Sequence, residues 1–366
     1  MNKKWTDVKG RYIRDPKYGH RLGKLYITSE KIRKSGYQSE IAEQSTDQYG
    51  FVDNGYSRKL PDKFCKDHIG IVIIGGSSAM GLGATSNSKT ISAVLEKNLR
   101  DKLSKIKISV INAGCGGYHS WDEMIYLLTE LILRKPQIVI SYTGLNDFCA
   151  EYFGSKYYDE RIPNTSRSLE DVAEAVKLGN FKVSFTELAK YKFKKTNLYG
   201  KLINIFRSQK GKKKLNEQNF IWGLENLKRQ YNPKIASQFW INQMSILGAC
   251  KVHNINYHLY IQSCYFWNQK KIITDQENIG IEYDKELLKK DYGEQCQKYF
   301  DDLRNEVKYF SYHFDGIKNI YGFLNNIFDD VKEQCYVDHC HLSNKGQEIV
   351  GKEIAKNILC SKIIKS

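Results

Sequence analysis

The chain of 366 residues is 41% hydrophobic and 27% charged, a balance that excludes a disordered chain and predicts one large folded domain, with or without an insertion. Its formal net charge of +16 raises nucleic acid and anionic membrane surfaces as partners. No apolar run approaches the roughly 18–20 residues that span a bilayer, and the start lacks the apolar stretch of a secretory signal, so we expect a cytoplasmic protein.

Several turn signals and few long periodic stretches mark the first 68 residues. We interpret residues 1–68 as an N-terminal extension that packs on the core. Short β-branched apolar runs then alternate with segments of helical periodicity. They predict a strand at 69–75, a helix at 88–103, a strand at 106–111, a helix at 122–133 and a strand at 137–142. This alternation favours a parallel α/β sheet, in which ligands bind at the carboxyl ends of the strands.

The pattern changes after Cys149. Residues 151–235 are polar, rich in Lys and Tyr, and mostly helical in periodicity, so we predict a helical cap inserted into a domain that spans 69–360. The core pattern then returns, with a helix at 238–252, a strand at 257–262, a helix from 285 to about 307 and a closing helix at 346–359.

Much of the positive charge lies in one part of the predicted cap. Residues 192–214 hold nine Lys or Arg and no acid, interleaved with apolar residues. A solvated helical face explains this pattern best, and peripheral membrane contact is the alternative. No base-reading motif accompanies the segment, so we expect no nucleic-acid partner. The nine cysteines form no CxxC pair and predict reduced, buried thiols rather than disulfides or a zinc ribbon.

Glycines flank a serine at the end of the first predicted core strand, in Gly75-Gly76-Ser77-Ser78. A serine at such a turn exposes its hydroxyl, and nearby backbone N–H groups can receive an anion. A phosphate-binding loop is the competing interpretation, but the segment lacks the lysine that a P-loop needs. Glycine–serine turns are common, so this motif alone decides little.

Two further motifs follow the next predicted strands. The second strand leads into Asn112-Ala113-Gly114-Cys115-Gly116-Gly117, whose glycines let the backbone approach a ligand or simply form a tight turn. The third leads into Gly144-Leu145-Asn146-Asp147, whose amide could donate to an oxyanion or cap a helix.

A candidate base lies near the C-terminus, in Asp338-His339-Cys340-His341. An Asp three residues before a His can orient the imidazole toward a serine. A metal site at His339, Cys340 and His341 is disfavoured, because neighbouring side chains point apart and no second ligand cluster has matching spacing. Because three motifs end consecutive strands of one sheet, we expect them to meet, and the fourth supplies the base.

These four segments, in this order, resemble the sequence blocks of the SGNH, or GDSL-like, serine hydrolase superfamily, in a subset with a GGS turn. The resemblance covers about residues 69–149 and 238–359 and implies a flavodoxin-like three-layer α/β/α sandwich. It implies Ser77 as nucleophile, His341 as general base and Asp338 as its partner. The N–H groups of Ser77 and Gly117 and the side chain of Asn146 resemble the oxyanion donors.

The sequence departs from the family pattern at Gly76, where an Asp is usual. Ser78 is a rival nucleophile and Gly114 a rival donor, although spacing favours Ser77 and Gly117. The resemblance implies a serine esterase for acyl, and by our hypothesis acetyl, esters of a small molecule or carbohydrate, with no cofactor or metal. An acyltransferase, a lipid esterase, and a polyanion- or membrane-binding protein with a vestigial site are the open alternatives. The oligomeric state is not predicted.

Overall fold

The computed structural model describes residues 12–15, 19–24, 27–31, 41–56, 60–152, 231–267, 270–288, 291–313, 321–361 and 364. The chain separates into two compact units, one formed by residues 1–152 and 230–366 and the other by residues 153–229. All of the predicted cap except its two ends, and the whole basic segment 192–214, lie outside the described residues, so both stay predictions.

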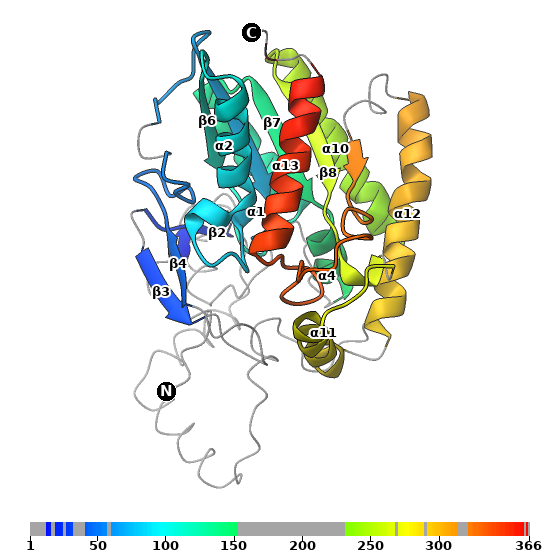
Figure 1. Ribbon diagram of the computed structural model, residues 1–366. Coiled ribbons are helices and arrows are strands. Elements are labelled where there is room, and N and C mark those ends of the chain that lie inside the picture. The colour runs from blue at the N-terminus through cyan, green and yellow to red at the C-terminus, as the bar shows by residue number, and fades with distance from the viewer. Residues whose placement is uncertain are drawn as a thin grey trace, which may run out of the picture. The chain divides into compact units, whose positions relative to one another are not determined.

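A five-stranded sheet forms the centre of the first unit (Figure 1), and all of its strand pairs are parallel. The strand order is β6-β5-β7-β8-β9. The first strand of the sheet thus lies between the second and the third, which is the flavodoxin-like doubly wound order. The strands are β5 (His68–Gly75), β6 (Lys107–Asn112), β7 (Ile138–Thr143), β8 (Asn256–Ile261) and β9 (Tyr321–Phe323).

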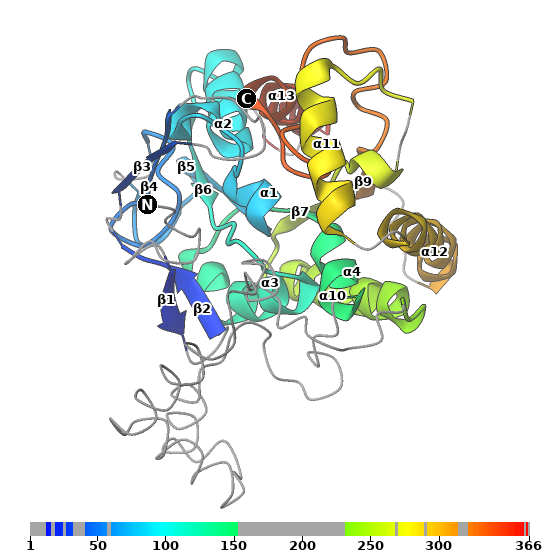
Figure 2. The same cartoon turned by 90° about the horizontal axis from the view of Figure 1, so that it is seen from below.

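Helices cover both faces of this sheet (Figures 1 and 2). On one face lie α2 (Ile91–Lys102) and α13 (Asn344–Cys360), which pack on each other. On the other lie α3 (Ser120–Tyr126) and α10 (Lys234–Val252), with α12 (Tyr292–His313) against α10. The predicted three-layer α/β/α sandwich is confirmed. Within the described residues, none of the helices is both long and apolar enough to span a bilayer.

Strand burial explains the apolar runs of the sequence. Every residue of β7 is buried, and in β5 only Ile69 is partly exposed. Strands covered by helices on both sides read as continuous apolar runs rather than alternating ones. Each fully buried aliphatic side chain contributes about 1.5–3 kcal/mol, so the central strands form a rigid base for the loops at their carboxyl ends.

Short strands occur in the N-terminal region, where the sequence predicted no regular element. β1 (Tyr12–Asp15) pairs with β2 (Gly19–Leu22), and β3 (Ile27–Lys31) pairs with β4 (Ile41–Ser45), both antiparallel. Further along, Val52 forms an antiparallel bridge to Asn112 at the end of β6. The Asn54 side chain donates to the backbone oxygen of Val110, 3.0 Å away. These contacts attach residues 52–54 to the edge of the sheet.

The predicted helix from 285 to about 307 is confirmed only in part, since residues 285–287 and 292–307 are helical but belong to different helices. The structure has two helices there, α11 (Asp275–Leu287) and α12, and the residue after α11, Leu288, is extended, with φ −80° and ψ 153°. The Thr274 hydroxyl and the Glu277 carboxylate form a capping box that begins α11 ten residues before the predicted start. The predicted helix 122–133 also differs, because α3 ends at Tyr126 and continues as a π-helix (Leu127–Leu131) and a 3-10 turn (Ile132–Arg134).

Candidate active site

Glycines place Ser77 at the carboxyl end of β5. Gly75 has φ +152°, and a Cβ there would lie 2.3 Å from the Tyr142 carbonyl oxygen. A Cβ on Gly76 would lie 2.2 Å from Nδ2 of Asn146. The positive φ and the backbone contact require glycine at position 75, whereas a side chain at position 76 would have to displace the Asn146 amide. The two glycines let the chain turn directly from β5 into α1 (Ser77–Met80). Ser77 is therefore the first helical residue, where backbone N–H groups have no acceptor within the helix.

A tight loop before α13 carries the imidazole. Tyr336 and Leu342 form an antiparallel bridge across it, and the Val337 N–H donates to the His341 oxygen at 2.9 Å. Inside the loop, Oδ1 of Asp338 accepts the N–H groups of Cys340 and His341, at 2.8 and 2.6 Å. This Asx-type turn explains why an aspartate three residues before the histidine fixes its position.

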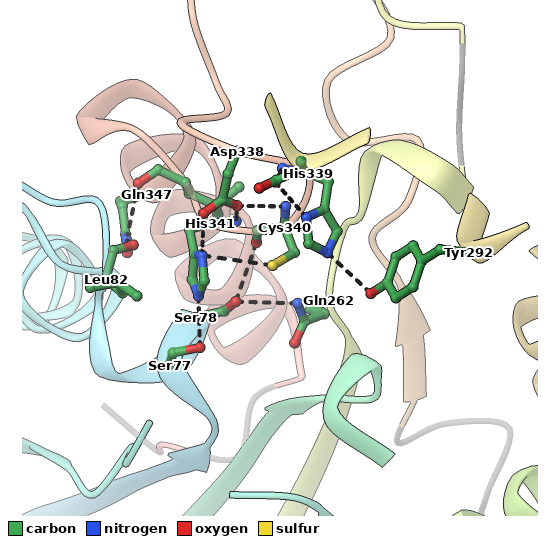
Figure 3. Close-up of polar contacts among 12 residues, drawn as sticks. Ser77, Ser78, Leu82, Gln262, Tyr292, Asp338, His339, Cys340, His341 and Gln347 are labelled. Atoms are coloured by element: carbon green, nitrogen blue, oxygen red, sulfur yellow. Dashed lines mark hydrogen bonds and ion pairs between the residues drawn. The ribbon is translucent and has the colours of Figure 1, made fainter. Parts of the chain in front are cut away.

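The structure brings Ser77, His341 and Asp338 into one hydrogen-bonded row (Figure 3). Oγ of Ser77 lies 2.7 Å from Nε2 of His341, although the two residues are 264 positions apart. Nδ1 of the same ring lies 2.5 Å from Oδ2 of Asp338. An imidazole held in this way can take the serine proton while the carboxylate keeps the ring in the required tautomer.

Electrostatics keep Asp338 ionised. Burial opposes its charge, but the imidazoles of His341 and His339 and the N–H of Cys340 outweigh burial and lower the pKa of Asp338 below its ordinary value. The carboxylate is thus charged throughout the neutral range. It can stabilise the imidazolium that forms when His341 accepts a proton.

The candidate oxyanion donors lie on three neighbouring strand ends. Ser77 follows β5, Gly117 lies in the loop after β6, and Asn146 lies in α4 (Leu145–Tyr152) after β7. Gly117 has φ +85°, a left-handed conformation that favours glycine. Nδ2 of Asn146 donates to the Tyr118 oxygen at 2.7 Å, which leaves its second N–H for another acceptor.

Both rivals weighed from the sequence have structural partners. Ser78 is buried, and its hydroxyl donates to the Cys340 oxygen and accepts from the Gln262 amide, both at 3.2 Å (Figure 3). The Gly114 N–H donates to Oδ1 of Asn112 at 3.0 Å, and a Cβ on Gly114 would lie 2.4 Å from the Met80 nitrogen. Ser78 therefore connects α1 to the loop that carries His341. Gly114 permits its backbone to pack closely against Met80 of α1.

A buried cluster of polar side chains joins α3, α4 and α10. The Asp147 carboxylate accepts both the N–H and the hydroxyl of Ser120, at 3.1 and 2.5 Å. Asn242 of α10 also donates to that hydroxyl, at 2.9 Å. Burial raises the pKa of Glu123 well above its ordinary value and so favours the neutral form of this acid. The cluster fixes α3 and α4 against each other.

A second His–Asp pair lies beside the first. Nδ1 of His339 is 2.7 Å from Oδ2 of Asp284 in α11, and its Nε2 is 3.2 Å from the Tyr292 hydroxyl (Figure 3). In the described residues, His339 and His341 belong to two different groups of metal-ligand type, Asp284–Asp338–His339 and Asp338–Cys340–His341. The ring nitrogens of the two histidines are thus aimed at different partners, unlike those of a shared metal site.

Sequence reasoning missed the long-range partners of the site. Asp284 is 55 residues from His339, and the contact between His20 and the oxygen of Gly116 joins residues 96 positions apart. No local pattern marks either residue. The only available signal was the Thr274–Glu277 capping box, which locates α11 but not its contact with the loop.

The family model of the GDSL-like lipase/acylhydrolases matches residues 35–354. The chain belongs to this family. It is therefore an ester-hydrolysing enzyme with the SGNH fold, and the family predicted from the sequence motifs is confirmed.

Solved structures show more distant similarity. The acetylxylan esterase Axe2 from Geobacillus stearothermophilus is 13% identical over 80% of this chain and 96% of its own, with a TM-score of 0.43. The lipase Lip_vut3 from a goat rumen metagenome is 10% identical over 79% and 97%, with a TM-score of 0.41. No curated protein matches this GDSL-like enzyme.

Proposed function

We propose that this enzyme is a serine esterase in which Ser77 is the nucleophile, His341 the general base and Asp338 its orienting partner. The proposal rests on one observation, the 2.7 Å contact between Oγ of Ser77 and Nε2 of His341. A nucleophile within hydrogen-bond reach of a base, which a third group orients in turn, is the arrangement that activates a serine.

In the proposed reaction, His341 takes the Ser77 proton while Oγ attacks the ester carbonyl. The carbonyl oxygen becomes an oxyanion, which the N–H groups of Ser77 and Gly117 and the amide of Asn146 receive. His341 then gives its proton to the departing alcohol, and water releases the acid from the acyl-enzyme by the same steps. The loss of one such donor costs on the order of 10²–10³ in rate. This chemistry needs no metal or organic cofactor.

The proposed substrate is an acetyl ester on a carbohydrate, because aromatic side chains, 13% of the sequence, can stack on sugar rings. One aromatic of the predicted cap is excluded from this role. Tyr152 is fully buried, and its hydroxyl donates to Asp291, so it is a packing residue. Phe153, Tyr157 and Tyr158 lie outside the described residues. A panel of esters that varies the acyl chain and the alcohol separately tests this proposal.

Labelling with a fluorophosphonate, followed by peptide mapping, tests the nucleophile. We expect the adduct on Ser77, no labelling of Ser77→Ala, and continued labelling of Ser78→Ala, whose hydroxyl has a structural partner. An adduct on Ser78, or no adduct on the folded wild-type protein, would contradict the proposal. Product analysis with and without an acceptor alcohol distinguishes hydrolysis from acyl transfer.

A further inference from the structure

The peptide between Gly116 and Gly117 carries a C=O group on one side and an N–H group on the other. Because the structure contains no cis peptide bonds among its described residues, the C=O of Gly116 and the N–H of Gly117 point in opposite directions. Whatever fixes the carbonyl therefore fixes the direction of the N–H. Gly117 has φ +85° and, as a glycine, could adopt many other conformations. A contact that fixes the Gly116 carbonyl would therefore also fix the orientation of this peptide.

Such a contact comes from the antiparallel pair of β1 and β2, which we call the N-terminal hairpin. Nε2 of His20, in β2, lies 2.8 Å from the carbonyl oxygen of Gly116. A carbonyl oxygen only accepts, so the ring must carry its proton on Nε2. Burial lowers the pKa of His20, and the ring is neutral at neutral pH. The hydrogen bond holds the Gly116 carbonyl toward the hairpin and turns the Gly117 N–H to the opposite side.

Tyr118 holds His20 in place and connects it to a second donor. Its hydroxyl donates to the His20 backbone oxygen at 2.6 Å, and the two rings meet edge to face, 5.3 Å apart. The Tyr118 carbonyl accepts from the Asn146 amide at 2.7 Å. His20 of β2 thus contacts the loop that precedes α3 at both Gly116 and Tyr118. One connected set of hydrogen bonds thus joins β2 to two of the proposed oxyanion donors.

We propose that His20 is a positioning residue of the oxyanion hole, which orients the Gly117 N–H through the Gly116 carbonyl. This inference rests on the proposed role of Gly117. His20 lies outside residues 35–354, which the family model matches. The N-terminal hairpin is then part of the esterase machinery.

Steady-state kinetics of His20→Ala on a small chromogenic acetyl ester test the inference. We expect kcat to fall about 10- to 100-fold, less than for loss of a donor, while KM changes less than about twofold. Affinity for a boronic acid that mimics the tetrahedral intermediate should fall in parallel. His20→Gln, whose amide can donate in place of the ring, should recover part of the lost kcat.

The matched control is His68→Ala. His68 is another buried histidine with a hydrogen bond to a protein oxygen, Oγ of Ser109 at 2.8 Å, but it lies at the amino end of β5, away from the site. His68→Ala should lower the free energy of unfolding and leave kcat unchanged. If His20→Ala does not fold, Tyr118→Phe decides, because it removes the hydroxyl that holds the His20 backbone. A lower kcat at unchanged KM supports the inference.

Two results would overturn it. The first is wild-type kcat in folded His20→Ala, or in Tyr118→Phe where that variant decides. The second is a kcat loss in His20→Ala that His20→Gln does not reduce. Ser77→Ala and Asn146→Ala, measured in parallel, separate the two proposals. Wild-type activity in those variants would reject the esterase site itself, whereas wild-type activity of the His20 variants alone rejects only the positioning role.

Discussion

Two imidazoles of one loop differ in chemistry because their partners differ. His341 lies between the Ser77 hydroxyl and the Asp338 carboxylate, so its Nε2 can take a proton from a neutral group. His339 lies between the Asp284 carboxylate and the Tyr292 hydroxyl. Burial of the His339 ring opposes protonation, but the charge and hydrogen bond of Asp284 outweigh it and raise the pKa of His339 to about 9. The second histidine is therefore a cation that stabilises the loop.

The raised pKa predicts a pH-dependent contribution to stability. The folded-state pKa is about 9, against an ordinary value of 6.5, so the ion pair contributes fully below about pH 6.5 and its contribution is lost as the pH rises through 9. Asp284→Asn should lower the free energy of unfolding by up to about 3 kcal/mol at pH 6, and the difference should shrink above pH 9. Urea unfolding across this range measures it.

Asp301→Asn is the control for this prediction, since Asp301 is an exposed carboxylate on neighbouring α12. It should change stability by less than about 0.5 kcal/mol at either pH. A loss for Asp284→Asn that is equal at pH 6 and pH 10 would contradict the proposed ion pair.

The absence of a Cβ atom at Gly76 leaves room for the Asn146 amide. The family usually has an aspartate here, but in this chain a Cβ would lie 2.2 Å from the Asn146 amide. Gly76→Ala should push that amide out of position and lower kcat by up to about 10²-fold, because a displaced oxyanion donor contributes little. Gly248→Ala on α10, where a Cβ meets nothing within 4 Å, is the matched control and should keep full activity. Equal kcat values for the two variants would argue against Asn146 as a donor.

At the scale of elements, α11 stabilises the loop that carries His341. The Glu277 carboxylate accepts the N–H groups of Cys335 and Tyr336, at 2.8 and 3.0 Å, and pairs with Nζ of Lys271 at 2.9 Å. The side chains of Lys271 and Glu277 are only 2% and 0% exposed. A buried carboxylate of this kind depends on its cation.

Lys271→Met should therefore destabilise the protein by about 3–5 kcal/mol, because it leaves Glu277 charged and buried without its partner. The midpoint of thermal unfolding measures the effect. Lys285→Met on α11 removes an exposed pair with Glu282, 2.7 Å apart, and should cost less than about 1 kcal/mol. Similar losses of stability in both variants would show that burial does not increase the contribution of the Lys271–Glu277 pair to folding.

The sequence allowed the prediction of elements whose signal is local. The apolar runs that became β5 and β7, and the glycines after them, follow directly from burial on both faces and from tight turns. Elements defined by distant contacts were missed. β9 has only three residues and exists as a strand because it pairs with β8. The prediction of one helix from 285 to about 307 missed both the start of α11 at Asp275 and the break before α12 at Tyr292.

The candidate site could be assembled from the sequence because strand ends of a parallel sheet share an edge. Ser77, Gly117 and Asn146 each follow a strand, so their proximity comes from topology. The contacts that orient them could not be predicted in the same way. His20 and Asp284 reach the site from an N-terminal hairpin and a helix outside the sheet, and neither position follows from periodicity.

Over the whole molecule, the proposed reaction depends on residues from the two ends of the core domain. Ser77 comes from the first strand of the sheet and His341 from the loop before the last helix, 264 residues later. The doubly wound order brings these ends together at the point where the strand order reverses, next to β5 and β7. The proposed site therefore forms only when the sheet is assembled, and we expect activity to report on the folding of the complete core.

Charge is also a property of the whole chain, and it gives the last prediction. Nine of its 57 Lys and Arg residues lie in residues 192–214, without an acid. Each basic residue near an anionic bilayer contributes about 1 kcal/mol, so a lipid esterase should sediment with phosphatidylserine vesicles at low salt. Replacing the nine residues with Gln should abolish sedimentation and leave hydrolysis of a soluble ester unchanged. If the wild-type protein does not sediment, the positive charge forms a solvated face, and the alternative of a lipid esterase is rejected.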